Sequence, residues 1–235
     1  SARASILRTT LAGSLLETLA YNLRREAAGV HVFEVGNVYF RAGEQPVEQL
    51  TLGLAGCGPI GPRGWNRPPD ERDFFDLKGT CEAVMAHLRL VPFDFAAGSC
   101  PWLEPELSLD LVYKGEKAGS LGALKKELAL KEGLPDPLWA AEIDLTALLA
   151  KTPPPFQTAP VGRFPSVVRD VSFLADRTLP YQEIRKAVEK AGLAALESFD
   201  LADRYEGEGV PPDKVSLSLR LVFRRRALGL DLLRL

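Results

Sequence analysis

The sequence is poor in the residues that most often bind metal ions or carry catalysis. It has three cysteines and two histidines in 235 residues. Cys57, Cys81 and Cys100 lie 24 and 19 residues apart, so no pair has the spacing of a zinc or redox motif, and we expect reduced thiols in a cytosolic protein. His31 and His87 have no second ligand at metal spacing, so we expect structural roles and no metal site.

Long apolar runs and a marked charge excess are also missing. No run approaches the ~20 residues of a membrane span, and no signal peptide is visible. The chain opens on Ser1 and enters a helical pattern almost at once, so we expect a piece of a longer protein. The net charge of −2 neither favours nor excludes a nucleic-acid partner. Residues 163–235 contain 13 Lys and Arg against 11 Asp and Glu, which leans slightly toward an anionic partner.

Catalytic motifs are scarce. No G-x-S-x-G and no P-loop lysine occur. Residues 56–61 match G-x-G-x-x-G, but a dinucleotide site needs a helix that opens at the third glycine, and prolines follow here. We therefore expect a loop, with a nucleotide-binding enzyme as the less favoured alternative. The acids of "DERDFFD" (70–76) indicate a helix entry rather than a catalytic cluster.

Hydrophobic periodicity predicts an α+β protein. The predicted elements of the first part are a helix at 10–26, strands at 30–40 and 50–56, a helix at 76–90, a hairpin at 107–124, and a strand with a short helix at 138–150. Residues 151–165 contain five prolines and are predicted to be a linker. A β-α-β-β order follows at 169–176, 179–192, 196–205 and 215–223, which is typical of a ferredoxin-like unit.

The last predicted strand alternates apolar residues with Ser216, Ser218 and Arg220. An open sheet face of this kind can stack bases and meet phosphates. The candidates for RNA contact are Arg169, Ser172, Arg204, Tyr205, Ser216, Ser218 and Arg220. Strict alternation places Tyr205 with Phe199 and Leu201 in the core, unless the strand bulges before it; both readings stay open.

Five separated blocks together carry a family resemblance. They are "ILRTTLAGSLLETLAYNLRR", "VFEVGNVYF", "DFFDLKGTCEAVM", "RFPSVVRDVSFLAD" and "FDLADRYEGEGVPPDKVSLSLRLVF". In this order and spacing the chain resembles the C-terminal portion of the bacterial phenylalanine–tRNA ligase β subunit, from about residue 6 to residue 224.

The resemblance implies a class II synthetase catalytic-like domain with a mixed or antiparallel sheet at residues 1–150. In the family this domain is non-catalytic and packs against the α subunit in an (αβ)₂ tetramer, and the lack of a motif 3 in this sequence agrees with that role. Residues 166–235 resemble the ferredoxin-fold anticodon-binding domain, which contacts tRNA(Phe). ATP and Mg²⁺ belong to the holoenzyme, with no cofactor in this piece, and the editing domain of the family lies upstream of Ser1.

The resemblance also implies roles for individual residues. Asp203-x-Tyr205-x-Gly207 matches a D-x-Y-x-G turn, and Lys214-x-Ser216-Leu217 matches K-x-S-L. Tyr205 is therefore expected to stack on a base. Arg169, Ser172 and Ser216 are expected beside it on the RNA face, with Arg204 and Arg220 as further contacts.

Two departures from the family pattern are visible. Cys100-Pro101 stands where the family usually has His-Pro. After Arg224 the sequence "RRALGLDLLRL" replaces the expected second helix and fourth strand, so we expect a truncated domain whose strand at 169–176 is an edge and whose apolar face is partly uncovered. The last leucines are expected to replace part of the lost helix. A protein-interaction scaffold without RNA binding is the alternative.

Overall fold

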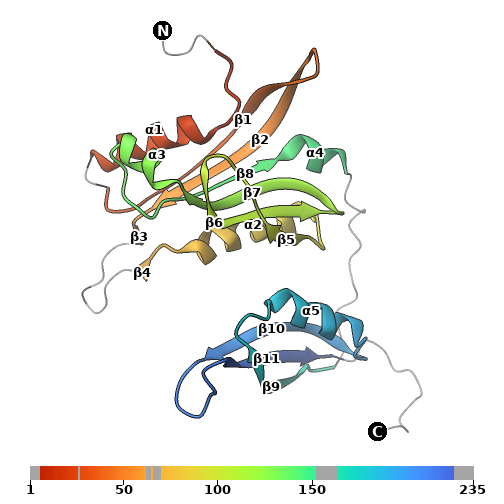
Figure 1. Cartoon of the computed structure of the whole chain (residues 1–235). Coiled ribbons are helices and arrows are strands. Elements are labelled where there is room, and N and C mark those ends of the chain that lie inside the picture. The colour runs from red at the N-terminus through yellow and green to blue at the C-terminus, as the bar shows by residue number, and fades with distance from the viewer. Residues whose placement is uncertain (1–5, 26, 62–64, 66–69, 152–163, 225–235) are drawn as a thin grey trace, which may run out of the picture. The chain divides into compact units, whose positions relative to one another are not determined.

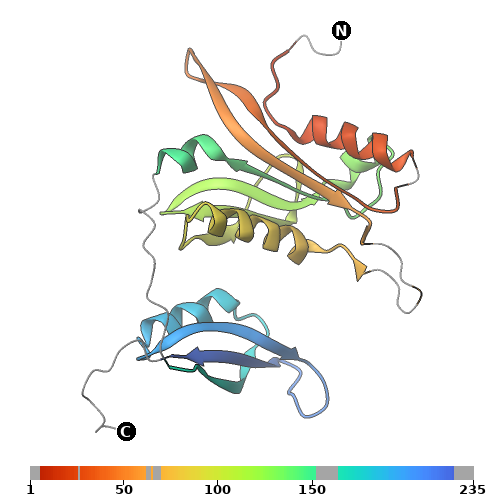
Figure 2. The same cartoon turned by 180° about the vertical axis from the view of Figure 1, so that it is seen from behind.

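The computed structural model describes residues 6–25, 27–61, 65, 70–151 and 164–224. The chain divides into two compact units, Ser1–Pro155 and Phe156–Leu235, and each is described by itself (Figures 1 and 2). Most of the predicted linker and the divergent C-terminal sequence lie outside the described residues.

The first unit is built on a six-stranded sheet in the order β1-β2-β8-β7-β6-β5, in which every neighbouring pair is antiparallel. Its elements are α1 (Ala12–Leu23), β1 (Val30–Ala42), β2 (Gln45–Cys57), β3 (Pro59–Ile60), β4 (Asp70–Glu71), α2 (Phe74–His87), β5 (Asp94–Ala97), β6 (Leu103–Tyr113), β7 (Glu116–Leu124), α3 (Lys126–Lys131), β8 (Trp139–Asp144) and α4 (Leu145–Ala150).

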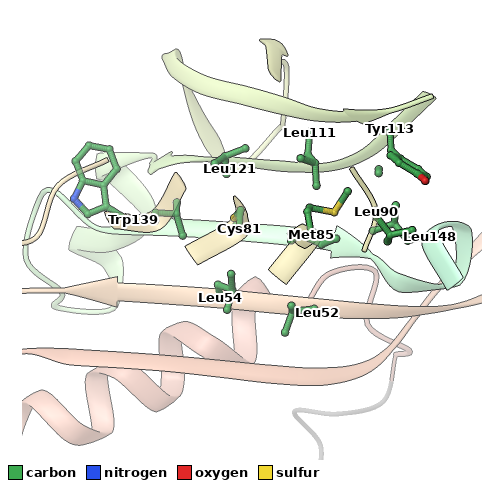
Figure 3. Close-up of a cluster of buried hydrophobic side chains, with 14 of the residues drawn as sticks. Leu52, Leu54, Cys81, Met85, Leu90, Leu111, Tyr113, Leu121, Trp139 and Leu148 are labelled. Atoms are coloured by element: carbon green, nitrogen blue, oxygen red, sulfur yellow. The ribbon is translucent and has the colours of Figure 1, made fainter. Parts of the chain in front are cut away.

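Both faces of this sheet are covered, so the unit has two cores. On one face Cys81 and Met85 of α2 pack over Leu54, Leu121 and other residues of the central strands (Figure 3). On the other face α1 packs with α3 over Ala55, Ala140 and Leu124. A Cβ at Gly53 would meet Leu15 Cδ1 at 2.8 Å, so the absence of a side chain in β2 lets α1 approach the sheet.

The region between β2 and α2 contains the predicted acidic helix entry and the glycine-rich motif. Asp73 and Asp76 form a capping box at the start of α2, in which Asp73 Oδ1 accepts from the Phe75 N–H at 2.7 Å and Asp76 Oδ2 from the Asp73 N–H at 2.8 Å. The acids therefore form a helix entry, as predicted. Gly58 and Gly61 have positive φ, as turns require, and the residues that follow Gly61 in the predicted loop lie mostly outside the described part of the chain.

The second unit has the predicted β-α-β-β order. Its elements are β9 (Val167–Asp176), α5 (Tyr181–Lys190), β10 (Leu196–Tyr205) and β11 (Lys214–Phe223), and the antiparallel sheet has the order β10-β11-β9. Ile184 of α5 packs on Val215, Leu217, Leu219 and Leu221 of the central strand. β9 is an edge strand within the described part, and Val171 on its helix-side face is 50% exposed.

Candidate nucleic-acid interface

The face of the second sheet opposite α5 is the candidate site, and we call it the open face. Because residues paired across strands share a face, the strand register assigns its members. They are Val168, Asp170, Ser172, Leu174 and Asp176 of β9, Lys214, Ser216, Ser218, Arg220 and Val222 of β11, and Ser198, Asp200, Asp203 and Tyr205 of β10.

A β-bulge decides where Tyr205 lies. Leu201 pairs with Leu219 on the core face, yet Asp203 pairs with the next residue, Ser218, so Ala202 has no partner. The extra residue reverses the alternation, and Tyr205 pairs with Ser216 on the open face. The side chain is 47% exposed. The alternative that Tyr205 is a core residue is therefore wrong.

The turn after β10 supports the Tyr205 ring from one side. A Cβ at Gly207 would lie 2.7 Å from Tyr205 Cζ and 2.5 Å from its hydroxyl oxygen. Any larger residue at position 207 would displace the ring. The glycine of the D-x-Y-x-G pattern thus lets the tyrosine fold back over its own turn.

Serine side chains of β9 and β11 lie beside Tyr205 on the open face. Ser172 Oγ and Ser218 Oγ lie 2.7 Å apart and share a hydrogen bond across β9 and β11. Ser216 lies between Tyr205 and Leu174 in the adjacent row. These side chains are too short to cover the Tyr205 side chain, which stays exposed.

The two cations of the open face are held by acids of β9. Arg220 makes a bidentate ion pair with Asp170, with Nε–Oδ1 and Nη2–Oδ2 distances of 2.9 and 2.8 Å, and Lys214 Nζ lies 2.5 Å from Asp176 Oδ1. The hydrogen bond from Arg220 lowers the pKa of Asp170. Neither cation is therefore a free charge for phosphate.

The open face is consequently acidic. It carries Asp170, Asp176, Asp200 and Asp203 against Lys214 and Arg220. Asp200 and Asp203 have no ion pair among the described residues. The described side chains of this face therefore carry a net negative charge. Asp203 lies on the open face two residues before Tyr205. It was not among the predicted contacts, because only the bulge brings its side chain to this face.

Two predicted neighbours lie on the opposite face. Arg169 pairs with Leu221 and Arg204 with Leu217, and both leucines are buried in the core under α5. Alternation separates Arg169 from Ser172, so these two residues do not share the RNA face as predicted. Arg204 is instead ion-paired with Glu206 in the following turn.

The cysteines and His31 lie in the first unit, in surroundings that suppress their charged forms. Burial raises the pKa of the Cys81 thiol to about 12 and lowers the pKa of His31, next to Arg72. No group of three His, Cys, Asp or Glu that could hold a metal ion occurs in the residues described. No helix found there is long and apolar enough to cross a membrane.

Comparisons with known proteins match both units. A family model described as "Phenylalanyl tRNA synthetase beta chain CLM domain" matches residues 1–145, and one described as "Ferredoxin-fold anticodon binding domain" matches residues 162–231. The phenylalanine–tRNA ligase β subunits of Symbiobacterium thermophilum and Thiobacillus denitrificans are 37% and 34% identical over 222 and 220 residues. Each alignment covers 94% of this chain but 25% and 27% of the relatives, so the chain spans about a quarter of their length.

Proposed function

Because the chain belongs to the phenylalanyl-tRNA synthetase β-chain family, we propose that its second unit binds the anticodon region of tRNA(Phe) through the open face. The observation that carries the proposal is the bulge at Ala202, because of which Tyr205 pairs with Ser216 on the open face. An exposed ring on a flat polar sheet offers a stacking platform for one unpaired base.

We further propose that this face reads bases rather than phosphates. Asp203 lies next to Tyr205 and has no ion-pair partner in the part of the chain described here, so its carboxylate is available as an acceptor. It would accept hydrogen bonds from a base edge that presents N–H groups, while Ser216 and Ser218 can donate or accept. Arg220 would keep Asp170 in place, and Arg169 and Arg204 would contact RNA only from the margins of the sheet.

The first unit would act as a class II catalytic-like domain that forms the interface with the α subunit in an (αβ)₂ tetramer. Phe33 and Val35 of β1 support this role: they pair with Leu54 and Leu52 and so share the α2-side face, but they are 73% and 53% exposed. Large apolar side chains exposed together on an edge strand are typical of a protein contact. ATP and Mg²⁺ would act at the α subunit, and no residue here is proposed to hold them.

Binding of an anticodon stem-loop tests the RNA proposal. Tyr205→Ala should weaken binding of a fluorescent tRNA(Phe) anticodon stem-loop by roughly 1–3 kcal/mol, which is the usual loss for one base-stacking aromatic. Fluorescence anisotropy at low and moderate salt gives the affinity. Thermal unfolding should change little, because nearly half of the Tyr205 side chain is exposed.

Tyr205→Phe is the matched control, since it keeps the ring and removes only the hydroxyl. It should retain most of the affinity. Absence of binding at low salt by the unsubstituted chain would contradict the RNA proposal and favour a protein-interaction scaffold. Phe33→Ser would then be the variant to compare for binding of the α subunit.

A further inference from the structure

The outer edge of β1 combines exposed side chains with backbone groups that face away from the sheet. β1 is the first strand of the six-stranded sheet and has β2 on one side only (Figure 1). His31, Phe33 and Val35 lie on the α2-side face of β1, and all three side chains are exposed, whereas the residues between them are half-buried. This part of the edge is therefore accessible to a partner.

Two hydrogen bonds show which backbone groups of β1 point away from β2. Near the end of the strand the Tyr39 N–H donates to the Arg8 carbonyl oxygen at 2.8 Å, and the Asn37 carbonyl oxygen accepts from Arg8 Nε at 2.9 Å. In an antiparallel strand the N–H and C=O of one residue point the same way, and the direction alternates along the chain. The register of β1 with β2 contains no shift, so all odd-numbered residues of β1 direct their backbone groups outward.

At His31, Phe33 and Val35 these outward groups have no hydrogen-bond partner in the part of the chain that the structure describes. A row of unpaired N–H and C=O groups on an edge strand is a template for a further strand. Residues paired across two strands share a face, so an added strand would bring every second side chain against the exposed side chains of these same three residues.

A cation with few hydrogen bonds lies at the His31 end of this edge. Arg72 has no ion pair among the residues described, and its Nε is buried without a hydrogen-bond partner. Its Nη1 lies 3.4 Å from His31 Nδ1. A Cβ at Gly56 would lie 3.3 Å from Arg72 Nε and 2.8 Å from His31 Cδ2, so both side chains lie over β2 on the α2-side face. Burial and then the charge of Arg72 lower the pKa of His31, with Asp76 acting the other way. A carboxylate beside Arg72 would supply the charge-assisted hydrogen bonds that the guanidinium lacks.

We propose that the α subunit adds an extended segment to the outer edge of β1 as an antiparallel strand. The segment forms backbone hydrogen bonds with His31, Phe33 and Val35. It has apolar side chains opposite Val35 and Phe33 and a carboxylate opposite His31 that binds Arg72, which gives the pattern apolar-x-apolar-x-acidic. Antiparallel pairing is the arrangement of every neighbouring pair in this sheet. This inference rests on the proposed contact between the first unit and the α subunit.

Val35→Pro tests the backbone pairing. Proline removes the outward N–H of residue 35 and leaves the hydrogen bonds between β1 and β2 intact, which is why edge strands tolerate proline. Biolayer interferometry of the whole chain with the purified α subunit gives the dissociation constant. Val35→Pro should weaken binding about tenfold, because it removes one hydrogen bond and obstructs its neighbours. Val35→Thr is the matched control, since it keeps the β-branched shape and the N–H, and it should weaken binding by less than about threefold.

Arg72→Gln tests the carboxylate. The substitution removes the charge and should weaken binding of the α subunit about fivefold, with a smaller loss at high salt. Lys131→Gln changes an exposed lysine of α3, which packs on the opposite face of the sheet, and should leave the affinity unchanged.

Hydrogen exchange in the unsubstituted chain gives a measurement that does not depend on the folding of any variant. In the free chain the amide hydrogens of His31, Phe33 and Val35 should exchange faster than those of Val32 and Glu34, which point toward β2. On addition of the α subunit the three outward amides should become protected. Exchange followed by NMR resolves each amide.

The outcomes separate the inference from the proposed function. Binding of the α subunit without protection of the outward amides, or with equal affinity in folded Val35→Pro and Val35→Thr, would overturn strand addition and leave the proposed subunit contact standing. If the unsubstituted chain does not bind the α subunit at all, the proposed subunit contact is wrong, and the inference is wrong with it.

Discussion

Glu142 lies on the central strand β8 and accepts three hydrogen bonds from the segment that begins α1. Thr10 Oγ1 donates to its Oε1 at 2.5 Å, and the N–H groups of Leu11 and Ala12 donate at 2.6 and 3.1 Å. The helix has no side-chain cap of its own, since Leu11 occupies the N-cap position. The Glu142 carboxylate therefore caps the N-terminus of α1 from a distant strand and joins the helix to the sheet.

Glu142→Ala should lower the free energy of unfolding of the first unit by about 2–3 kcal/mol, because it leaves partly buried N–H groups without an acceptor. Glu142→Gln should lose clearly less, because an amide oxygen remains. Urea unfolding followed by tryptophan fluorescence gives both values. A loss in Glu142→Ala no larger than in Glu142→Gln would contradict the role of the carboxylate as a cap.

Sequence reasoning could not have found this role. In "WAAEID" the glutamate takes the polar position of an alternating strand, which is the ordinary place for a solvent-facing residue. Its partners, Thr10 and Leu11, are more than 130 residues away. Only the antiparallel pairing of β8 with β2, under α1, brings them together.

At the scale of elements, the second unit shows what hydrophobic periodicity can predict and what it cannot. The periodicity predicted β9, α5, β10 and β11, and all four are present. The hairpin of β6 and β7 was predicted in the same way. The short elements β5 and α3 were not predicted, since too few residues carry a period. The sequence analysis left open whether the strand bulges before Tyr205, because one unpaired residue leaves no pattern in a sequence.

Deletion of Ala202 tests whether the bulge is needed for RNA binding. Without the extra residue, alternation would continue from Leu201, and Tyr205 would move to the core face. The affinity for the anticodon stem-loop should then fall by about as much as in Tyr205→Ala, roughly 1–3 kcal/mol. Ala202→Ser keeps the chain length and should bind normally. Normal binding by a folded deletion variant would show that the bulge does not position Tyr205.

At the scale of the whole molecule, the two units have separate hydrophobic cores. The clusters around Met85 and around Leu19 belong to the first unit, and the cluster around Leu219 belongs to the second. The family resemblance predicted two modules from sequence blocks, whereas the charge excess counted over residues 163–235 does not describe the open face. Net charge counts residues without regard to pairing. On the open face Arg220 is ion-paired with Asp170, and Lys214 is ion-paired with Asp176.

Separate cores predict separate unfolding. All three tryptophans lie in the first unit, so tryptophan fluorescence reports on that unit alone, whereas far-ultraviolet circular dichroism reports on both. Leu219→Ala removes a side chain that is 4% exposed in the second core and should destabilise that unit by about 2–5 kcal/mol. The circular dichroism transition should broaden or split, while the fluorescence midpoint stays where it is. Glu142→Ala destabilises the first unit and should therefore lower the fluorescence midpoint. If Leu219→Ala shifts the fluorescence midpoint as far as it shifts the circular dichroism transition, the two units unfold as one, and stability in one core depends on the other.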